Sequence, residues 1–175
     1  FGHARGAFTG AVAAREGYVA KAEGGTLFVD EVAELSPTAQ ARLLRFLQER
    51  EYQRIGETAT RTADVRVVSA TNVDLARRVA EGRFRQDLWY RLKTDRVAVP
   101  PLRERDDDIL LLTRHFLRTR AAADGRAPAL LSPAVEDALL RHPWPGNVRE
   151  LGNEAHRLAV RAAGREATLD DLSAD

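Results

Sequence analysis

The sequence predicts an α/β fold, in which a parallel-sheet core is followed by a small bundle of three helices. Two short apolar runs, TLFVDE (Thr26 to Glu31) and DVRVVSATN (Asp64 to Asn72), have the length and β-branched composition of buried parallel strands. A helical pattern lies between them, which makes a βαβ unit with a right-handed crossover. Beyond about Leu102 only helical patterns remain.

The helix between the two strands has clear start signals. Ser36 is expected as its N-cap and Pro37 as its first residue. Leu43, Leu44 and Leu47 then fall on one face. The pattern predicts a helix that packs this face on the sheet.

The next segments alternate between turns and short elements. YQRIGETATRTAD predicts two short strands or a loop around Gly56. From Val73 to Leu92 a helical stretch is interrupted near Gly82. A third apolar run, DRVAVPPL, is expected as a further strand that ends at Pro100, because proline donates no ladder hydrogen bond.

Three helices are expected in the second half. The first begins with DDD, whose charges complement the helix dipole, and ends at Gly125. The second begins after Ser132, with Pro133 in first position. For the third, Asn147 is expected as the N-cap, with Glu150 completing an analogue of the capping box.

The composition is that of a globular protein, and it excludes several functional classes. Hydrophobic residues make up 44% and charged residues 30% of the chain. Without cysteine there is neither a disulfide framework nor thiolate chemistry, and the four histidines lack metal-ligand spacing. No apolar run reaches the roughly 18 residues of a membrane span, and no signal peptide is visible, so a cytoplasmic protein is expected.

Polar residues stand at the carboxyl ends of the two predicted strands, where parallel sheets bind ligands. Asp30 and Glu31 follow the first strand, and Thr71 and Asn72 follow the second. Adjacent carboxylates suit phosphate chemistry, since one can orient hydrated Mg²⁺ while the other polarises an attacking water. Asn72 would then hold that water or sense the terminal phosphate. Alternatively, the acids face solvent or cap the next helix.

Three arginines also have two interpretations each. Arg85 and Arg91 are six residues apart in FRQDLWYRL, which is not a same-face spacing on a helix. They are either solvated or reach the nucleotide of a neighbouring subunit. Arg149 falls in the first turn of the last helix, where a cation opposes the helix dipole. Glu150, Asp137 or a bound phosphate would compensate its charge.

The stretch GAFTGA, from Gly6 to Ala11, places Phe8 between two glycines. Because glycine is the residue with the greatest conformational freedom, this pattern predicts a mobile tip that carries an apolar contact.

In chain order, the motifs GAFTGA, GGTLFVDE, the ATN after VRVVS, FRQDLWYRL, PPLRERDDDI and WPGNVREL resemble the central AAA+ domain of the sigma-54-dependent bacterial transcription activators, also called bacterial enhancer-binding proteins. The resemblance covers Phe1 to about Leu158. It implies a partial AAA+ α/β core over residues 1–102, a helical lid subdomain over 103–166 and a linker over 167–175.

The resemblance implies roles for the strand-end residues. Asp30 and Glu31 match the Walker B pair, with Asp30 on Mg²⁺ through water and Glu31 activating the attacking water. Thr71 and Asn72 match sensor I. With the arginines described next, the implied catalytic set is Asp30, Glu31, Thr71, Asn72, Arg85 and Arg91.

The resemblance also implies contacts to other molecules. Arg85 and Arg91 match arginine fingers that act on a neighbouring protomer, and Arg149 matches the sensor II arginine. Nucleotide binding is thereby assigned to Asp30, Asn72 and Arg149. The implied contacts to sigma-54 are Gly6, Ala7, Phe8, Thr9, Gly10 and Ala11.

The function implied is that of an ATPase ring, usually a hexamer, in a transcription regulator of the two-component type. With ATP and Mg²⁺ as cofactors, the ring remodels the sigma-54 RNA polymerase holoenzyme for promoter opening, and the complete protein contacts promoter and enhancer DNA. No membrane partner is expected. Phe8 is expected to be lifted or lowered according to the nucleotide state.

One family motif is missing from these 175 residues. A P-loop, GxxxxGK[ST], needs a Gly-Lys pair, yet Lys21 follows Ala20 and Lys93 follows Leu92. In the family this loop lies upstream of GAFTGA. We therefore expect ATP hydrolysis in the complete protein, but little ATP binding and exposed apolar sheet surface in this polypeptide alone.

Two other functions compete with this interpretation. The arginine-rich helices from Arg141 to Arg165 are compatible with a DNA-binding module, although acidic residues interrupt any basic face. An inert oligomerisation scaffold is the other alternative, and the intact acidic pair argues against it.

Overall fold

The computed structural model describes residues 1–7 and 9–173, so Phe8 of the GAFTGA stretch lies outside the described residues. The chain divides into two compact units, Phe1–Arg96 (unit 1) and Val97–Asp175 (unit 2). None of the helices in the described ranges combines the length and hydropathy of a membrane span.

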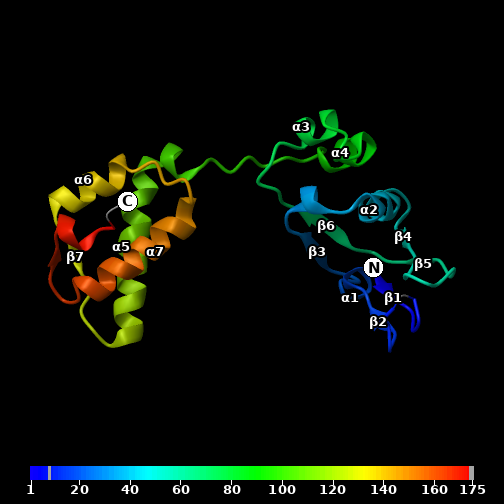
Figure 1. Cartoon of the computed structure of the whole chain (residues 1–175), viewed down its shortest axis with the longest axis horizontal. Helices are drawn as coiled ribbons and strands as arrows, with labels where there is room; N and C mark the ends of the chain where they lie inside the picture. Colours follow the sequence, from blue (N-terminus) through cyan, green and yellow to red (C-terminus); the bar gives the residue numbers. More distant parts are fainter. Residues whose placement is uncertain (8, 174–175) are drawn as a thin grey trace. The chain divides into compact units, whose positions relative to one another are not determined.

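Unit 1 is built on the predicted βαβ unit (Figure 1). β3 (Thr26–Val29) pairs in parallel with β6 (Arg66–Ser69), and α2 (Pro37–Glu49) connects them. The Ser36 hydroxyl accepts a hydrogen bond from the Ala39 N–H at 3.3 Å, which caps α2 as expected. The α/β prediction with a parallel strand pair is confirmed.

The other elements of unit 1 are short. Two antiparallel pairs, β1 with β2 and β4 with β5, form hairpins. The bounds of these elements are β1 (Gly2–His3), β2 (Arg15–Glu16), α1 (Tyr18–Lys21), η1 (Val32–Glu34), β4 (Glu51–Tyr52), β5 (Arg61–Thr62), α3 (Leu75–Ala80) and α4 (Gln86–Leu92).

α2 contributes to two apolar clusters of unit 1. Phe46 belongs to one, and Leu43 and Leu44 belong to the other. The buried members of the first cluster are Val19, Phe46, Tyr52, Ala63 and Val65, and those of the second are Val32, Leu43, Leu44, Phe84 and Leu88. The second cluster joins the chain that leaves β3 to the start of α4.

The strands are not buried on both faces within the described chain. Leu27 and Val29 pack against the clusters, whereas Phe28 is 59% exposed and Val68 38%. Exposed apolar sheet surface was expected. The prediction of a strand in DRVAVPPL is wrong. That segment has no strand partner in the described residues, and Val97 is 87% exposed.

Unit 2 is the predicted three-helix bundle. It contains α5 (Asp106–Asp124), α6 (Pro133–Arg141) and α7 (Asn147–Arg161). Its short elements are η2 (Leu102–Glu104), β7 (Leu130–Leu131), β8 (Glu166–Ala167) and η3 (Leu169–Asp171). A single core joins all three helices, and its fully buried side chains include Leu102, Ile109, Leu117, Val135, Leu139, Leu151 and Leu158.

The start of α7 differs from the expected cap. Gly146 is the N-cap and Asn147 is the first helical residue, with a left-handed φ of 53°. The Asn147 side chain is used elsewhere, since its Oδ1 accepts from the Leu102 N–H at 2.8 Å. Glu150 reaches back to the N-cap, but its partner is not Asn147: its Oε2 accepts from the Gly146 N–H, four residues earlier, at 2.7 Å.

Residues 167–172, expected as part of a linker, have regular structure. β8 pairs in parallel with β7, and Ala167 is fully buried. Asp171 is 6% exposed and closes a capping box with Thr168. This segment packs on the three helices of unit 2 and contributes Ala167 and Leu172 to their core.

Candidate functional site

The carboxyl ends of β3 and β6 lie side by side. Backbone pairing continues past the strands, because the Ala70 N–H donates to the Val29 carbonyl at 2.9 Å and the Val32 N–H donates to the Ala70 carbonyl at 2.9 Å. The residues that follow each strand are therefore held at one edge of the sheet. The structure brings together the four strand-end residues selected from the sequence, which are Asp30, Glu31, Thr71 and Asn72.

Glu31 connects the two strand ends. Its backbone has φ 48° and ψ 52°, in the left-handed region that few glutamates adopt. Its Oε2 accepts a hydrogen bond from the Asn72 N–H at 3.2 Å, and its own N–H donates to Asp30 Oδ1 at 3.0 Å. Such backbone conformations cluster at functional sites, and here the turn directs the carboxylate to the neighbouring strand end.

The donor set at this edge fits a hydrated Mg²⁺ ion. Asp30 is exposed and Glu31 half-buried, and each keeps one carboxylate oxygen without a hydrogen-bond partner in the described chain. Mg²⁺ prefers oxygen ligands, and one or two carboxylates suffice because it retains several waters. In the described ranges no group of three or more His, Asp or Glu that could hold a metal ion occurs.

Arg85 and Arg91 lie outside this group, at the two ends of α4. Arg85 donates from Nε to Asp87 Oδ1 at 3.0 Å and from Nη2 to Asp87 Oδ2 at 2.6 Å. Hydrogen bonding to this guanidinium lowers the pKa of Asp87, and the carboxylate in turn raises the pKa of Arg85. Arg91 donates to the Leu47 carbonyl at 3.2 Å. Both arginines are exposed.

Arg149 lies in unit 2, exposed in the first turn of α7. Neither anion suggested by the sequence is used by it. Asp137 pairs with Arg141 at 2.9 Å, and Glu150 Oε1 lies 3.8 Å from His142 Nε2. Within the described residues Arg149 has no ion pair, which leaves its guanidinium available to an external anion.

The GAFTGA loop is the connection of the β1–β2 hairpin. Gly6 and Gly10 have φ values of 77° and 100°, a region that side chains disfavour. The Gly6 N–H donates to the Ala11 carbonyl at 2.8 Å, and Ala11 is buried. Phe8 is outside the described residues, so its expected mobility stays a prediction.

The sequence did not reveal what supports this loop. The Ala4 N–H donates to the Ile55 carbonyl at 2.9 Å, and the Ile55 N–H donates to the Gly2 carbonyl at the same distance. A Cβ at Gly56 would lie 2.8 Å from the Ala7 Cβ. The turn between β4 and β5 thus packs against the base of the GAFTGA loop, and glycine at 56 is the only signal for it in the sequence.

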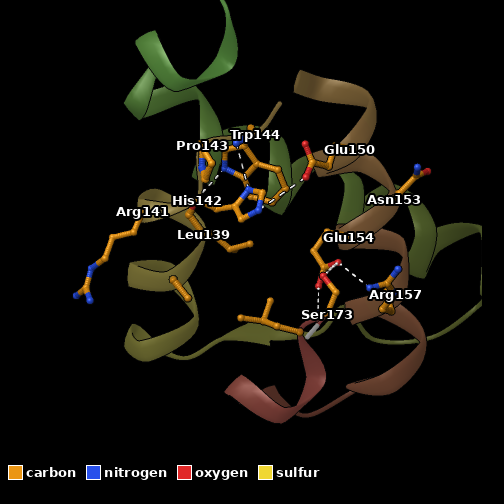
Figure 2. A pocket seen from close by; sticks show the side chains of 12 residues that line it. Leu139, Arg141, His142, Pro143, Trp144, Glu150, Asn153, Glu154, Arg157 and Ser173 are labelled. Carbon is orange, nitrogen blue, oxygen red and sulfur yellow. Dashed lines mark hydrogen bonds and ion pairs between the residues drawn. The ribbon is translucent and has the colours of Figure 1, made fainter. Parts of the chain in front are cut away.

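Unit 2 contains a cavity of about 540 Å³ that the sequence did not predict (Figure 2). His142 Nδ1 accepts from the Trp144 N–H at 3.1 Å on one side of it. On the other side Glu154, only 7% exposed, accepts from the Ser173 N–H and hydroxyl, both at 2.8 Å. Glu150 also lines the cavity, but none of the residues to which the sequence assigns catalysis, nucleotide binding or contact with sigma-54 does.

Two family models match the chain. The Sigma-54 interaction domain matches residues 1–98, and the AAA+ ATPase lid domain matches residues 103–175.

Curated proteins and solved structures give concordant matches. The DNA-binding transcriptional regulator NtrC of Salmonella typhimurium is 49% identical over 172 residues, which are 98% of this chain and 37% of NtrC. The alginate biosynthesis transcriptional regulatory protein AlgB of Pseudomonas aeruginosa is 50% identical over 98% of this chain and 38% of AlgB. The crystal structure of NtrX from Brucella abortus in complex with ADP superposes with a TM-score of 0.88 at 36% identity, over 91% of this chain and 37% of NtrX. The chain spans 37–39% of the length of the curated relatives it matches.

Proposed function

Because the chain belongs to the family of sigma-54-dependent activators, with a sigma-54 interaction domain followed by an AAA+ lid, we propose that it is part of an ATPase module that couples ATP hydrolysis to remodelling of sigma-54 RNA polymerase. The observation that carries this proposal is the meeting of Asp30, Glu31, Thr71 and Asn72 at the ends of β3 and β6. The division into a core of residues 1–102, a lid and a following linker belongs to the same proposal, although residues 167–172 pack with the lid.

The cofactors proposed are ATP and Mg²⁺. NtrX of Brucella abortus has been solved with ADP and with ATP, which supports nucleotide binding in this family. When bound, Mg²⁺ would neutralise charge on the phosphates and so favour transfer of the terminal phosphoryl group to water, with ADP as the leaving group. Asp30 would hold the hydrated ion, and its exposed carboxylate has a free oxygen for this purpose.

Glu31 is proposed to activate the attacking water. Its carboxylate would accept a proton from the water, with Thr71 and Asn72 holding the water and sensing the terminal phosphate. Anchoring of Glu31 Oε2 by the Asn72 N–H supports this assignment, because it fixes the carboxylate while Oε1 remains available.

The arginines would neutralise charge that develops on the phosphate. Arg85 and Arg91 are proposed to do so on a neighbouring protomer of a ring, usually a hexamer, since both are exposed. Arg149 would contact a phosphate from the lid, and the lack of an anion beside it in the described chain supports this role.

The partner proposed is the sigma-54 RNA polymerase holoenzyme, contacted by the GAFTGA loop of residues 6–11. This would place the activity in the bacterial cytoplasm. Promoter and enhancer DNA would be reached through the complete protein, in keeping with the names of the relatives as transcriptional regulators.

A DNA-binding helical module is the weaker alternative. Of the arginines between residues 141 and 165, Arg141, Arg157 and Arg165 pair with carboxylates of unit 2, and Arg161 donates to backbone carbonyls. Because these arginines are bound to groups of unit 2, they form no basic face for phosphates. The inert scaffold is disfavoured by the free carboxylate oxygens of Asp30 and Glu31.

The test is Glu31→Gln in the complete protein. We expect ATP turnover to fall about 10²- to 10⁴-fold, because the base is lost, while ATP still binds. Glu34→Gln is the matched control, since Glu34 is three residues away and pairs with Arg78, and it should retain turnover within about twofold. Unchanged hydrolysis in Glu31→Gln would overturn the proposed function.

A further inference from the structure

Gln40 is a buried polar side chain in the middle of unit 1. It lies on α2, is 2% exposed, and uses every polar atom of its amide. Its Nε2 donates to the Leu35 carbonyl at 2.9 Å and to the Arg83 carbonyl at 3.2 Å, and its Oε1 accepts from the Arg85 N–H at 2.9 Å. Two carbonyls and one N–H fit only this orientation of the amide.

These three partners come from two separate parts of the chain. Leu35 ends the 3₁₀ turn η1, which begins directly after Glu31. Arg83 and Arg85 lie on either side of Phe84, at the entrance to α4, and are 43 and 45 residues from Gln40. One amide therefore joins the chain leaving the acidic strand end to the chain that carries the proposed arginine finger.

The segment 83–85 is clamped at three points. Phe84 is 4% exposed within the apolar cluster of Leu43 and Leu88, which fixes the side chain between the two hydrogen bonds of Gln40. The Arg85 backbone is thereby held as the N-cap of α4, so the Arg85 side chain starts from a fixed Cα position. The Asp87 carboxylate, which also accepts from the Leu88 N–H at 2.8 Å, holds the other end of the Arg85 side chain.

We propose that Gln40 is a positioning residue for Arg85. By fixing the backbone at residues 83–85 relative to the turn that follows Glu31, it sets where the Arg85 guanidinium emerges toward a neighbouring protomer. This inference rests on the proposed function, because it assigns to Gln40 an effect on a finger that acts in another subunit.

Gln40→Met in the complete protein tests it, because methionine keeps the shape and removes all three hydrogen bonds. We expect kcat for ATP hydrolysis to fall about 10- to 100-fold, with KM for ATP within about twofold, since small displacements of catalytic groups cost this much. Adding Gln40→Met to Arg85→Ala should cause no further loss. Gln48→Met, an exposed glutamine of the same helix, is the matched control and should match the unmodified protein.

A mixed ring separates positioning from a general structural defect. Gln40→Met protomers keep their acids, and Glu31→Gln protomers keep their fingers, so random mixing creates about one intact interface in four. ATP turnover in the mixture should exceed that of either variant alone. No recovery, an effect confined to KM, or unchanged kcat in Gln40→Met would each overturn the inference.

Two further measurements keep the result interpretable. Thermal unfolding checks that Gln40→Met is folded, and if it is not, Gln40→Asn, which keeps the amide but shortens its reach, enters the same assays with the same expected split between kcat and KM. If Glu31→Gln leaves turnover unchanged, the proposed function fails, and if only Arg85→Ala does, the finger role of Arg85 fails. If Arg85→Ala loses turnover and folded Gln40 variants do not, only the role of Gln40 fails.

Discussion

In unit 1 the carboxylates of Asp30 and Glu31 reach the surface with an oxygen to spare, whereas in unit 2 the carboxylates of Glu154 and Asp171 are buried and bonded to their neighbours. Glu154 accepts two hydrogen bonds from Ser173 and pairs with Arg157 at 3.2 Å. Unit 2 uses these charges to close its own fold. In unit 1, by contrast, the described chain makes no hydrogen bond to the second carboxylate oxygens of Asp30 and Glu31.

The apolar residues of the two units differ in the same sense. Unit 2 has one continuous core with fully buried side chains from α5, α6 and α7. Unit 1 has two clusters around α2, and Phe28 and Val68 on its parallel strands remain exposed within the described chain. The comparison predicts that substitutions in unit 1 change activity first and that substitutions in unit 2 change stability first.

The largest effect is expected from Arg85→Ala. If Arg85 acts as a finger, ATP turnover of the complete protein should fall about 10³-fold, without a measurable loss of stability because exposed ion pairs contribute little. Arg45→Ala is a close control. Both side chains are 47% exposed, and Arg45 pairs with Glu49 at 2.8 Å much as Arg85 pairs with Asp87. Turnover is measured at saturating ATP. An equal loss in the two variants would refute a catalytic role for Arg85 that Arg45 does not share.

Leu158→Ala should break unit 2 instead. Leu158 is completely buried in its core, so the cavity should lower the free energy of unfolding by about 3 kcal/mol. Urea unfolding of the 175-residue chain, followed by Trp144 fluorescence in a Trp89→Phe background, reports on unit 2 alone. Val160→Ala, on the same helix and 56% exposed, should change this free energy by less than about 0.5 kcal/mol. Similar losses in the two variants would mean that the core of unit 2 is not what stabilises it.

Arg149 sharpens the comparison, because it is the charged residue of unit 2 that we expect to act as unit 1 residues do. Arg149→Ala should weaken ATP binding by the complete protein about tenfold, in line with one lost charge-assisted hydrogen bond, and leave stability unchanged. Arg118 on α5 is likewise exposed and without an ion pair in the described chain, so Arg118→Ala serves as the control. Calorimetric titration with ATP decides, and equal affinities for the two variants would remove Arg149 from the site.

Local patterns were sufficient for the strands and the acids. The apolar runs of β3 and β6 end abruptly in polar residues, and in a parallel pair this alone brings Asp30 and Asn72 to one edge. Ser36 and Gly125 were likewise found from their own positions, since caps depend on residues within one turn of the helix.

What the sequence did not predict depends on distant partners. Asn147 is a residue type common at N-caps, but its Oδ1 accepts a hydrogen bond from the Leu102 N–H, 45 residues away. The amide of Gln40 is bound by Arg85 over the same separation. DRVAVPPL has strand composition, yet a strand needs a neighbour, and none of the described residues provides one. Side-chain type predicts capacity for hydrogen bonding, whereas partners follow from the tertiary fold.

The smallest effect is expected at low pH, in the segment that closes unit 2. Hydrogen bonds from Arg165 and from the Thr168 N–H hold the pKa of Asp171 well below its usual value. A lowered pKa in the folded state stabilises unit 2 at neutral pH, and this contribution is lost as the pH falls below about 4, the value of an unfolded aspartate, toward the folded one. Asp171→Asn should therefore be less stable than the unmodified chain at pH 7, with a difference that shrinks toward pH 2. Asp170→Asn, at an exposed neighbour with no ion pair in the described residues, is the matched control and should change the free energy of unfolding at pH 7 by less than about 0.5 kcal/mol. Urea unfolding at several pH values measures both, and a difference for Asp171→Asn that is independent of pH would show that the charge of Asp171 does not hold this segment in place.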